Sequence, residues 1–171
     1  MSATATRTYL EMHSPEDLRA AAAPCDGVRI ERVTARVPSF WRYLYVEVGR
    51  AYHWVDRLPW TDEDILRYLD DPAIQLWVMT VAGAPAGYFE LRQVGDDSVE
   101  VAYFGVLQEF IGRGLGKYLL SVALEEAWAL GPSRVWLHTS SLDHPSALSN
   151  YLARGLKIFK IETYEVPEGH L

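Results

Sequence analysis

The spacing of apolar and polar residues predicts strands and helices along most of the chain. Alternation with a period of two, or a short apolar run, indicates a strand, whereas apolar residues three and four positions apart indicate a helix. Several strands come first and a strand–helix–strand–helix–strand order follows, so we expect an α/β (α+β mixed) fold with one main sheet. The predicted strands are Thr8–Met12, Gly27–Val33, Leu76–Val81, Ala86–Arg92, Val99–Val106, Arg134–Thr139 and Lys157–Val166.

Capping residues mark the starts of the expected helices. Ser14, Pro15 and the two acids after them predict a helix that runs through Leu18–Ala23 and stops at Pro24. Thr61 followed by Asp64 forms a capping box with Asp in place of Glu. A second helix is expected to start at Pro38, and Gly49 either ends or only interrupts it. Three more helices are expected, from Thr61 to Asp70, from the glycines Gly112–Gly116 to Gly131, and from Pro145 to Arg154.

The length of 171 residues suits one domain with a sizeable core. No repeat, low-complexity stretch or linker divides the chain. We therefore predict a single domain over residues 1–171, in which residues 1–35 form an accessory N-terminal strand–helix–strand. The sequence does not identify what this leader pairs with.

The charge balance narrows the kinds of partner. The net charge is −7, which argues against nucleic acid or an anionic membrane and favours a cationic partner. The single cysteine, Cys25, excludes an internal disulfide and fits a reduced, cytoplasmic protein. The first residues lack an apolar signal-peptide region, and no segment approaches the roughly 18 apolar residues of a membrane span.

Three alternating glycines, Gly112, Gly114 and Gly116, lie between the strand ending at Val106 and a long apolar helix. Glycines allow close backbone approach and positive φ, and the unpaired N–H groups of a helix N-terminus attract anions. The turn is therefore expected either to bind an anion or only to let the helix pack tightly on the strand, and the glycines alone favour the second. The turn does not match a Walker A loop, because Ile111 stands where the first glycine of that loop would be. It also does not match a Rossmann fingerprint, whose third glycine would fall at position 117 or 119, because those positions hold Lys117 and Leu119.

Two motifs resemble those of the GCN5-related N-acetyltransferase (GNAT) superfamily. Residues 100–120 resemble the cofactor motif, a strand followed by [Q/R]-x-x-G-x-[G/A] opening a long helix; Gly114 and Gly116 match it, and Ile111 replaces the Gln or Arg. Residues 137–156 resemble the closing motif N-x-x-A-x-x-x-Y followed by Gly-Phe. Ala147, Tyr151 and Gly155 match there, whereas His144 replaces Asn and Leu156 replaces Phe. The resemblance covers about residues 75–166.

The resemblance implies a GNAT fold: a V-shaped, mixed, mostly antiparallel sheet flanked by helices and splayed between two central parallel strands. Acetyl-coenzyme A would lie in the splay as cosubstrate, its pantetheine arm along the strand edge and its pyrophosphate on the glycine turn. The implied cofactor-binding residues are Phe104, Gly105, Val106, Ile111, Gly112, Arg113, Gly114, Leu115, Gly116, Lys117, His144, Ala147 and Tyr151.

The implied activity is direct transfer of the acetyl group to a primary amine in a ternary complex. Two alternatives stay open: a non-catalytic GNAT-like module that binds an acyl-CoA or a peptide as a sensor, and a transferase for a longer acyl-CoA. The acceptor would be a small-molecule or peptide amine, and a homodimer is also open. No HxH, HExxH or CxxC spacing occurs, and the reaction needs no metal.

Tyr151 is the candidate general acid, because it matches the family tyrosine near the cofactor sulfur. Glu100 is the first candidate base and Glu90 the second. By strand alternation, Glu100, Ala102, Phe104 and Val106 are expected to share one face. His138 and His144 could also carry protons, although a lone histidine more often packs or faces solvent.

The aromatic stretch Tyr52–Trp60 lies where the family places its acceptor-binding segment. Trp54 and Trp60, with Glu90, are the candidate substrate-binding residues. Aromatic rings beside acids such as Asp56 would suit a cationic amine. The alternative for most of these rings is ordinary core packing.

Overall fold

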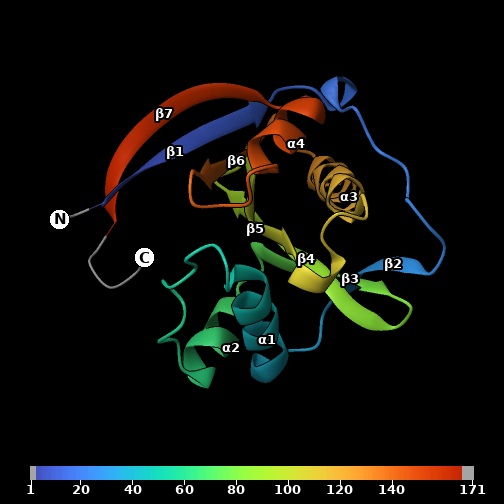
Figure 1. Ribbon diagram of the computed structural model, residues 1–171, viewed down its shortest axis with the longest axis vertical. Coiled ribbons are helices and arrows are strands. Elements are labelled where there is room, and N and C mark those ends of the chain that lie inside the picture. The colour runs from blue at the N-terminus through green and yellow to red at the C-terminus, as the bar shows by residue number, and fades with distance from the viewer. Residues whose placement is uncertain (1–2, 167–171) are drawn as a thin grey trace.

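A seven-stranded sheet organises residues 3–166, the part of the chain that this computed structural model describes (Figure 1). Its strand order is β2-β3-β4-β5-β6-β1-β7, and every neighbouring pair is antiparallel except β5 and β6. The strands are β1 (Ala3–Met12), β2 (Val28–Val33), β3 (Ile74–Val81), β4 (Ala84–Val94), β5 (Ser98–Val106), β6 (Arg134–Ser140) and β7 (Lys157–Val166).

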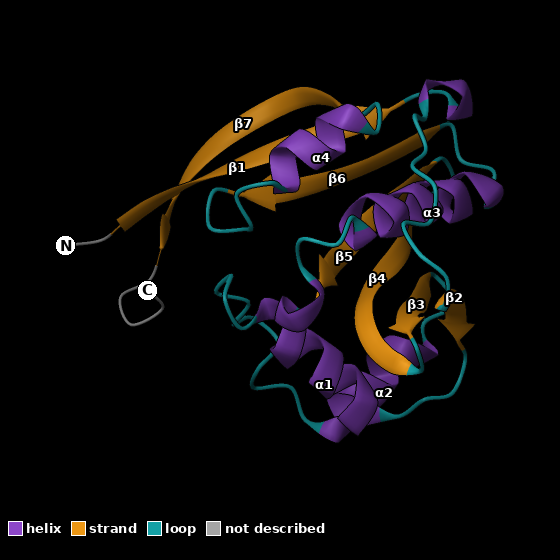
Figure 2. Ribbon diagram, turned by 45° about the vertical axis from the view of Figure 1, so that its right-hand side comes forward, coloured by secondary structure: helices purple, strands orange, loops and turns teal. Residues whose placement is uncertain are grey.

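Helices pack on both faces of the sheet (Figure 2). On one face, Trp41, Leu44 and Tyr45 of α1 form a core with β3 and β4. On the other face, the apolar side of α3 packs in a second core with β4, β5 and β6. The helices are α1 (Pro38–Gly49), α2 (Asp62–Asp70), α3 (Leu115–Ala129) and α4 (Ala147–Ala153), with short 3-10 turns η1 (Pro15–Asp17) and η2 (Gln108–Phe110).

The parallel strands β5 and β6 diverge soon after they meet. Only Ser98–Glu100 pairs with Arg134–Trp136. Beyond Glu100, the β5 edge that faces β6 has no ladder partner within the described residues, and Figure 2 shows the two parts of the sheet separating there. This confirms the V-shaped mixed sheet expected from the sequence, and it leaves backbone N–H and C=O groups of β5 open to a ligand.

A bulge at Ala102 reverses the side-chain alternation of β5. Val101 lies opposite Leu91, but Tyr103, not Ala102, lies opposite Glu90. Glu100 and Tyr103 therefore face α1 and α2, whereas Phe104 turns to the α3 side and packs with Tyr151. The expectation that Glu100, Ala102, Phe104 and Val106 share one face was wrong, because period-two alternation holds only in an unbulged strand.

The leader contains one helix fewer than expected. Only the single turn η1 forms, so the predicted helix through Leu18–Ala23 was wrong. These residues run extended instead: the Arg19 N–H donates to the carbonyl of Arg154, and the Ala21 N–H donates to Ser121 Oγ. The strands before and after lie far apart in the sheet order, β1 between β6 and β7 and β2 at the opposite edge.

The predicted helix boundaries hold in the middle of the chain. Thr61 Oγ1 accepts the Asp64 N–H and the Asp64 carboxylate accepts the Thr61 N–H, which completes the capping box of α2. Helix α1 ends at Gly49. A Cβ at Gly49 would lie 2.4 Å from Trp54 Cβ, so this glycine lets Trp54 fold back against the helix end.

Candidate active site

The glycine turn before α3 presents free backbone donors. Gly112 and Gly114 have φ of 84° and 75°, and Gly114 caps α3 without any side-chain hydrogen bond. The N–H groups of the first helical turn have no acceptor inside the helix. They point out of the helix start, with the helix dipole behind them. This arrangement suits a diphosphate.

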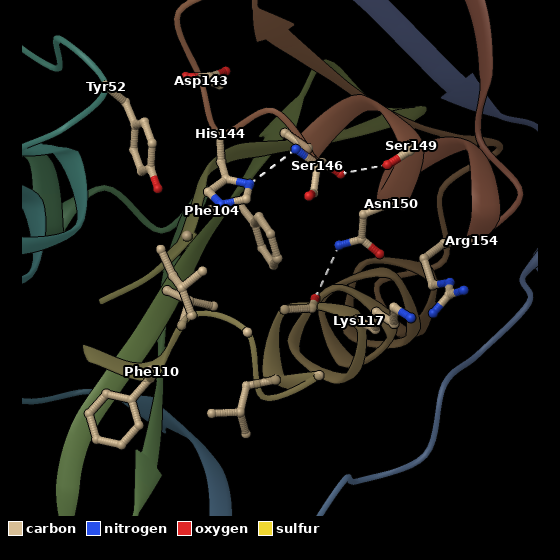
Figure 3. Close-up of a pocket in the computed structure, with 18 of the residues that line it drawn as sticks. Tyr52, Phe104, Phe110, Lys117, Asp143, His144, Ser146, Ser149, Asn150 and Arg154 are labelled. Atoms are coloured by element: carbon tan, nitrogen blue, oxygen red, sulfur yellow. Dashed lines mark hydrogen bonds between the residues drawn. The ribbon is translucent and has the colours of Figure 1, made fainter. Parts of the chain in front are cut away.

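A cavity of about 540 Å³ opens over this turn, between α3, the free edge of β5 and α4 (Figure 3). It is lined by all of the candidate cofactor residues except Arg113 and Tyr151. Arg113 instead lies over the Phe110 ring, 5.1 Å from its centroid. The sequence motif and the three-dimensional cavity thus coincide in most positions.

Helix α4 forms the wall of the cavity opposite the turn. Asn150 donates from Nδ2 to the carbonyl of Gly116, at 3.3 Å, and so ties α4 to the start of α3. His144 Nδ1 accepts the Ser146 N–H at 3.0 Å, while the imidazole also lines the cavity. The accepted hydrogen bond makes His144 Nδ1 the unprotonated nitrogen, which leaves Nε2 for the proton.

Tyr151 lies behind the cavity wall. It is 6% exposed and packs edge-on against Phe104, with 6.1 Å between the ring centroids. Burial raises the pKa of Tyr151 well above its ordinary value, and the charge of Asp143 adds to this. The phenol therefore keeps its proton at neutral pH, as a proton donor must.

A second cavity, of about 340 Å³, adjoins the first. Both are lined by Tyr52, Trp54, Phe104 and Asp143. A group held in one cavity can therefore meet a group held in the other at these four residues. Asp143 is fixed at the junction, since its Oδ2 accepts from Thr139 Oγ1 at 2.7 Å and from the Ser140 N–H at 2.8 Å.

Glu100 lines the second cavity with only 4% of its surface exposed. Its Oε2 accepts from Nε and Nη2 of Arg92, at 3.0 and 2.5 Å. Its Oε1 lies 4.0 Å from Nε2 of His138. Burial lowers the pKa of His138, as does the charge of Arg7, against an opposing pull from Glu100. A neutral imidazole therefore stands next to the carboxylate.

Glu90 lines neither cavity. It is fully buried, and both of its oxygens accept from Arg57 Nη1, at 3.0 and 3.1 Å. Tyr68 donates to the same carboxylate at 2.5 Å. The Arg57 guanidinium also lies 3.9 Å from the centroid of the Tyr103 ring. Although burial alone would lower the pKa of Arg57, the charge of Glu90 raises it overall, so the guanidinium keeps its charge.

The two candidate tryptophans differ in position. Trp54 lines both cavities and packs edge-on against Tyr103 at 5.1 Å between centroids. Trp60 stacks on Trp41, with 5.4 Å between centroids and 2° between the ring planes, and lines neither cavity. Trp60 therefore packs in the core, which was the alternative for these aromatic residues, and lies outside both cavities.

Sequence reasoning did not pick out several residues at these cavities, namely Arg7, Arg57, Arg92, Asn150 and Arg154. Arg154 and Asn150 lie within the closing motif at positions that the motif leaves unspecified, and the three other arginines come from segments far apart in the sequence. No local pattern marks them.

Two features are absent from the described residues, a cluster of metal-binding side chains and a membrane-spanning helix. No group of three or more His, Cys, Asp or Glu side chains within residues 3–166 is arranged to hold a metal ion. None of the helices in this part of the chain is long and apolar enough to cross a membrane.

Comparison with known proteins identifies relatives. Residues 39–155 match the family model of the acetyltransferase (GNAT) family. A GCN5-related N-acetyltransferase from Kribbella flavida superposes with a TM-score of 0.69 at 22% identity, over 97% of this chain and 60% of that one. A GCN5-related N-acetyltransferase from Sphaerobacter thermophilus gives a TM-score of 0.69 at 19% identity, over 95% and 52%. No curated protein matches the sequence significantly.

An aminoglycoside acetyltransferase from an uncultured soil sample, solved with trehalose, superposes with a TM-score of 0.61 at 18% identity, over 75% of this chain and 88% of that one. At such identities the likeness establishes the fold. The chain spans little more than half the length of the Kribbella and Sphaerobacter proteins, at 60% and 52%.

Proposed function

Because the chain belongs to the acetyltransferase (GNAT) family, we propose that it transfers the acetyl group of acetyl-coenzyme A directly to a primary amine. The observation that carries this proposal is the pair of adjoining cavities. One lies over the glycine turn and the open β5 edge, and the other brings Glu100 and His138 together. Strands β1 and β2 belong to the same sheet as the rest, which supports one N-acetyltransferase domain over residues 1–171.

The lining of the first cavity suits the chemistry of coenzyme A. Its free N–H groups at Gly112–Gly116 would hold the pyrophosphate, and the open edge of β5 at Phe104–Val106 would pair with the amides of the pantetheine arm. When bound, acetyl-coenzyme A supplies an activated thioester. His144 and Ala147 would bound the arm on the α4 side.

In the proposed reaction, the Glu100–His138 pair removes the proton from the amine. Because the pKa of His138 is lowered, its imidazole is neutral at neutral pH and can accept a proton. Glu100, held by Arg92, stabilises the imidazolium that forms. Glu90 takes no part in this step, since Arg57 and Tyr68 occupy its carboxylate.

Protonation of the leaving sulfur falls to Tyr151. A phenol of ordinary pKa is already protonated at neutral pH, and burial raises the pKa of Tyr151 further. Its ring packs on Phe104, which lines both cavities, so it lies beside their junction. The phenol would donate its proton to the thiolate as the carbon–sulfur bond breaks, and would regain a proton from solvent before the next turnover.

The acceptor is a small or slender amine. The second cavity, at about 340 Å³, admits a compact amine or the end of a peptide, and Trp54 and Asp56 in its wall suit an ammonium group. The size and lining of this cavity support a small-molecule or peptide amine as the acceptor. The exposed, free thiol of Cys25 supports a cytoplasmic location for the enzyme.

Calorimetric titration with coenzyme A, followed by an amine panel with acetyl-coenzyme A and a thiol reagent, tests the proposal. We expect binding and release of free thiol with at least one amine. Gly114→Glu is the matched negative control, because it puts bulk and a negative charge at the pyrophosphate position. No binding to the wild-type chain would refute the proposal. Binding without turnover would favour the non-catalytic sensor, and turnover only with longer acyl-CoA donors would change the donor.

A further inference from the structure

Arg154 is partly buried, and two nitrogens of its guanidinium find no partner within the described residues. It caps the end of α4 and lines the larger cavity. Its Nε and Nη1 atoms are buried and have no hydrogen-bond partner within the described part of the chain. Removing a cation from water without a partner costs free energy. A position that keeps such a side chain in a cavity wall is suited to an anionic ligand.

A second cation stands on the facing helix. Asn150 of α4 bonds the carbonyl of Gly116 in α3, and Arg154 follows Asn150 by one helical turn while Lys117 follows Gly116 directly. Both Lys117 and Arg154 line the cavity, and Figure 3 draws their side chains on the side of the view away from Tyr52. The Asn150 Oδ1 atom is also buried without a partner.

No acid within residues 3–166 forms an ion pair with either of these two cations. The carbonyl oxygen of Asp17 lies 2.1 Å from the position of a Cβ at Gly155, but no ion pair within residues 3–166 includes the Asp17 carboxylate. The charge of the pair is therefore left for a ligand.

We propose that Arg154 and Lys117 bind the 3′-phosphate of coenzyme A, and that this contact selects coenzyme A over its dephosphorylated form. The proposal rests on the proposed function, because it assumes that coenzyme A occupies the cavity. The pyrophosphate is already served by the backbone N–H groups of the glycine turn, which need no side-chain cation. A monoester dianion is the remaining anionic group, and a guanidinium fork beside an ammonium matches it.

Calorimetry on Arg154→Met with two ligands, coenzyme A and 3′-dephospho-coenzyme A, tests the assignment. We expect the affinity for coenzyme A to fall by about tenfold to a hundredfold, the usual worth of a charge-assisted phosphate contact. The affinity for the dephospho form should change by less than about threefold, within the usual effect of a lost surface contact. Arg67→Met, on the exposed side of α2, is the matched control and should change neither affinity.

Two outcomes would overturn the assignment while leaving the proposed function intact. An equal loss of affinity for both ligands would indicate that Arg154 binds the pyrophosphate. Unchanged affinity for both ligands would show that Arg154 does not contact coenzyme A. The melting temperature of the ligand-free variant is the second measurement. It should stay level or rise, since Met removes an unpaired buried charge; a fall would show that Arg154 is structural. A wild-type chain that binds neither ligand would refute the proposed function itself.

Discussion

Arg57 and Glu90 fix the segment between α1 and α2 onto the sheet. Their side chains are only 10% and 0% exposed. The guanidinium bonds both carboxylate oxygens and also Tyr68, and aromatic rings enclose it. Residues 50–61 contain no regular helix or strand, so this ion pair supplies much of what holds Trp54 and Asp56 at the second cavity.

We predict that Glu90→Gln destabilises the fold by roughly 3 kcal/mol, because it leaves the Arg57 charge buried without its counter-charge. Urea unfolding followed by circular dichroism measures this. Glu63→Gln is the control, since Glu63 is 87% exposed and its pair with Arg67 is solvent-screened. A variant with wild-type stability but an altered pH–rate profile would contradict this structural role and return Glu90 to the list of candidate bases.

The pH dependence of the reaction should report on His138. Its ordinary pKa of 6.5 is lowered in the fold, so the base is neutral above that pH and is lost only as pH falls below it. The rate should therefore decline on the acid side with a midpoint below 6.5. His138→Gln should lower kcat by roughly a hundredfold and abolish that decline.

His13→Gln is the control for that substitution, because His13 is exposed and pairs only with Glu11. If His138→Gln keeps the acid-side decline while Glu100→Gln removes it, the carboxylate takes the proton itself. The measurement is kcat as a function of pH for all three variants at saturating acetyl-coenzyme A.

At the scale of whole elements, local signals were predictable and long-range ones were not. The capping box at Thr61 and the glycine start of α3 depend on residues within one turn, so the sequence showed them. The segment Leu18–Ala23 has good helix formers, but its backbone donors are used elsewhere: the Arg19 N–H bonds the carbonyl of Arg154 and the Ala21 N–H bonds Ser121 Oγ. These partners lie about 100 residues or more further along the sequence, so tertiary contacts override helix propensity here.

That extended leader packs tightly on the end of α4, and Gly155 makes this possible. Gly155 has φ of 105°, and a Cβ there would lie 2.1 Å from the carbonyl oxygen of Asp17. We predict that Gly155→Ala destabilises the fold by roughly 3 kcal/mol or more, from backbone strain plus the clash. Guanidinium unfolding measures it.

Gly131→Ala separates strain from clash. Gly131 follows the end of α3 just as Gly155 follows the end of α4, its φ is 79°, and no atom lies within 4 Å of its Cβ position. It should cost only about 1–2 kcal/mol, the penalty of the left-handed conformation. Equal losses for the two variants would mean that the leader does not press on Gly155.

Across the whole molecule, more residues could be predicted from the sequence in one half of the candidate site than in the other. The cofactor half is built from two contiguous motifs, so most of its residues were named in advance. The acceptor half combines Arg7 from β1, Arg57 from a loop, Arg92 from β4 and His138 from β6. These meet only through sheet order, and the bulge at Ala102 changes which β5 residues join them.

Burial of tyrosines between the sheet and the helices sets an upper pH limit on the stability of the fold. Burial is the largest cause that raises the pKa of five tyrosines: Tyr45 to about 12, and Tyr68, Tyr88, Tyr103 and Tyr151 in the same direction. In the unfolded chain a phenol ionises near pH 10. The stability from keeping these phenols neutral is thus complete below about pH 10 and is lost as pH rises through the folded values. We predict that their phenolate absorbance develops only together with the loss of far-ultraviolet circular dichroism. Ionisation of every tyrosine near pH 10 with the circular dichroism unchanged would show that the phenols between sheet and helices are open to solvent.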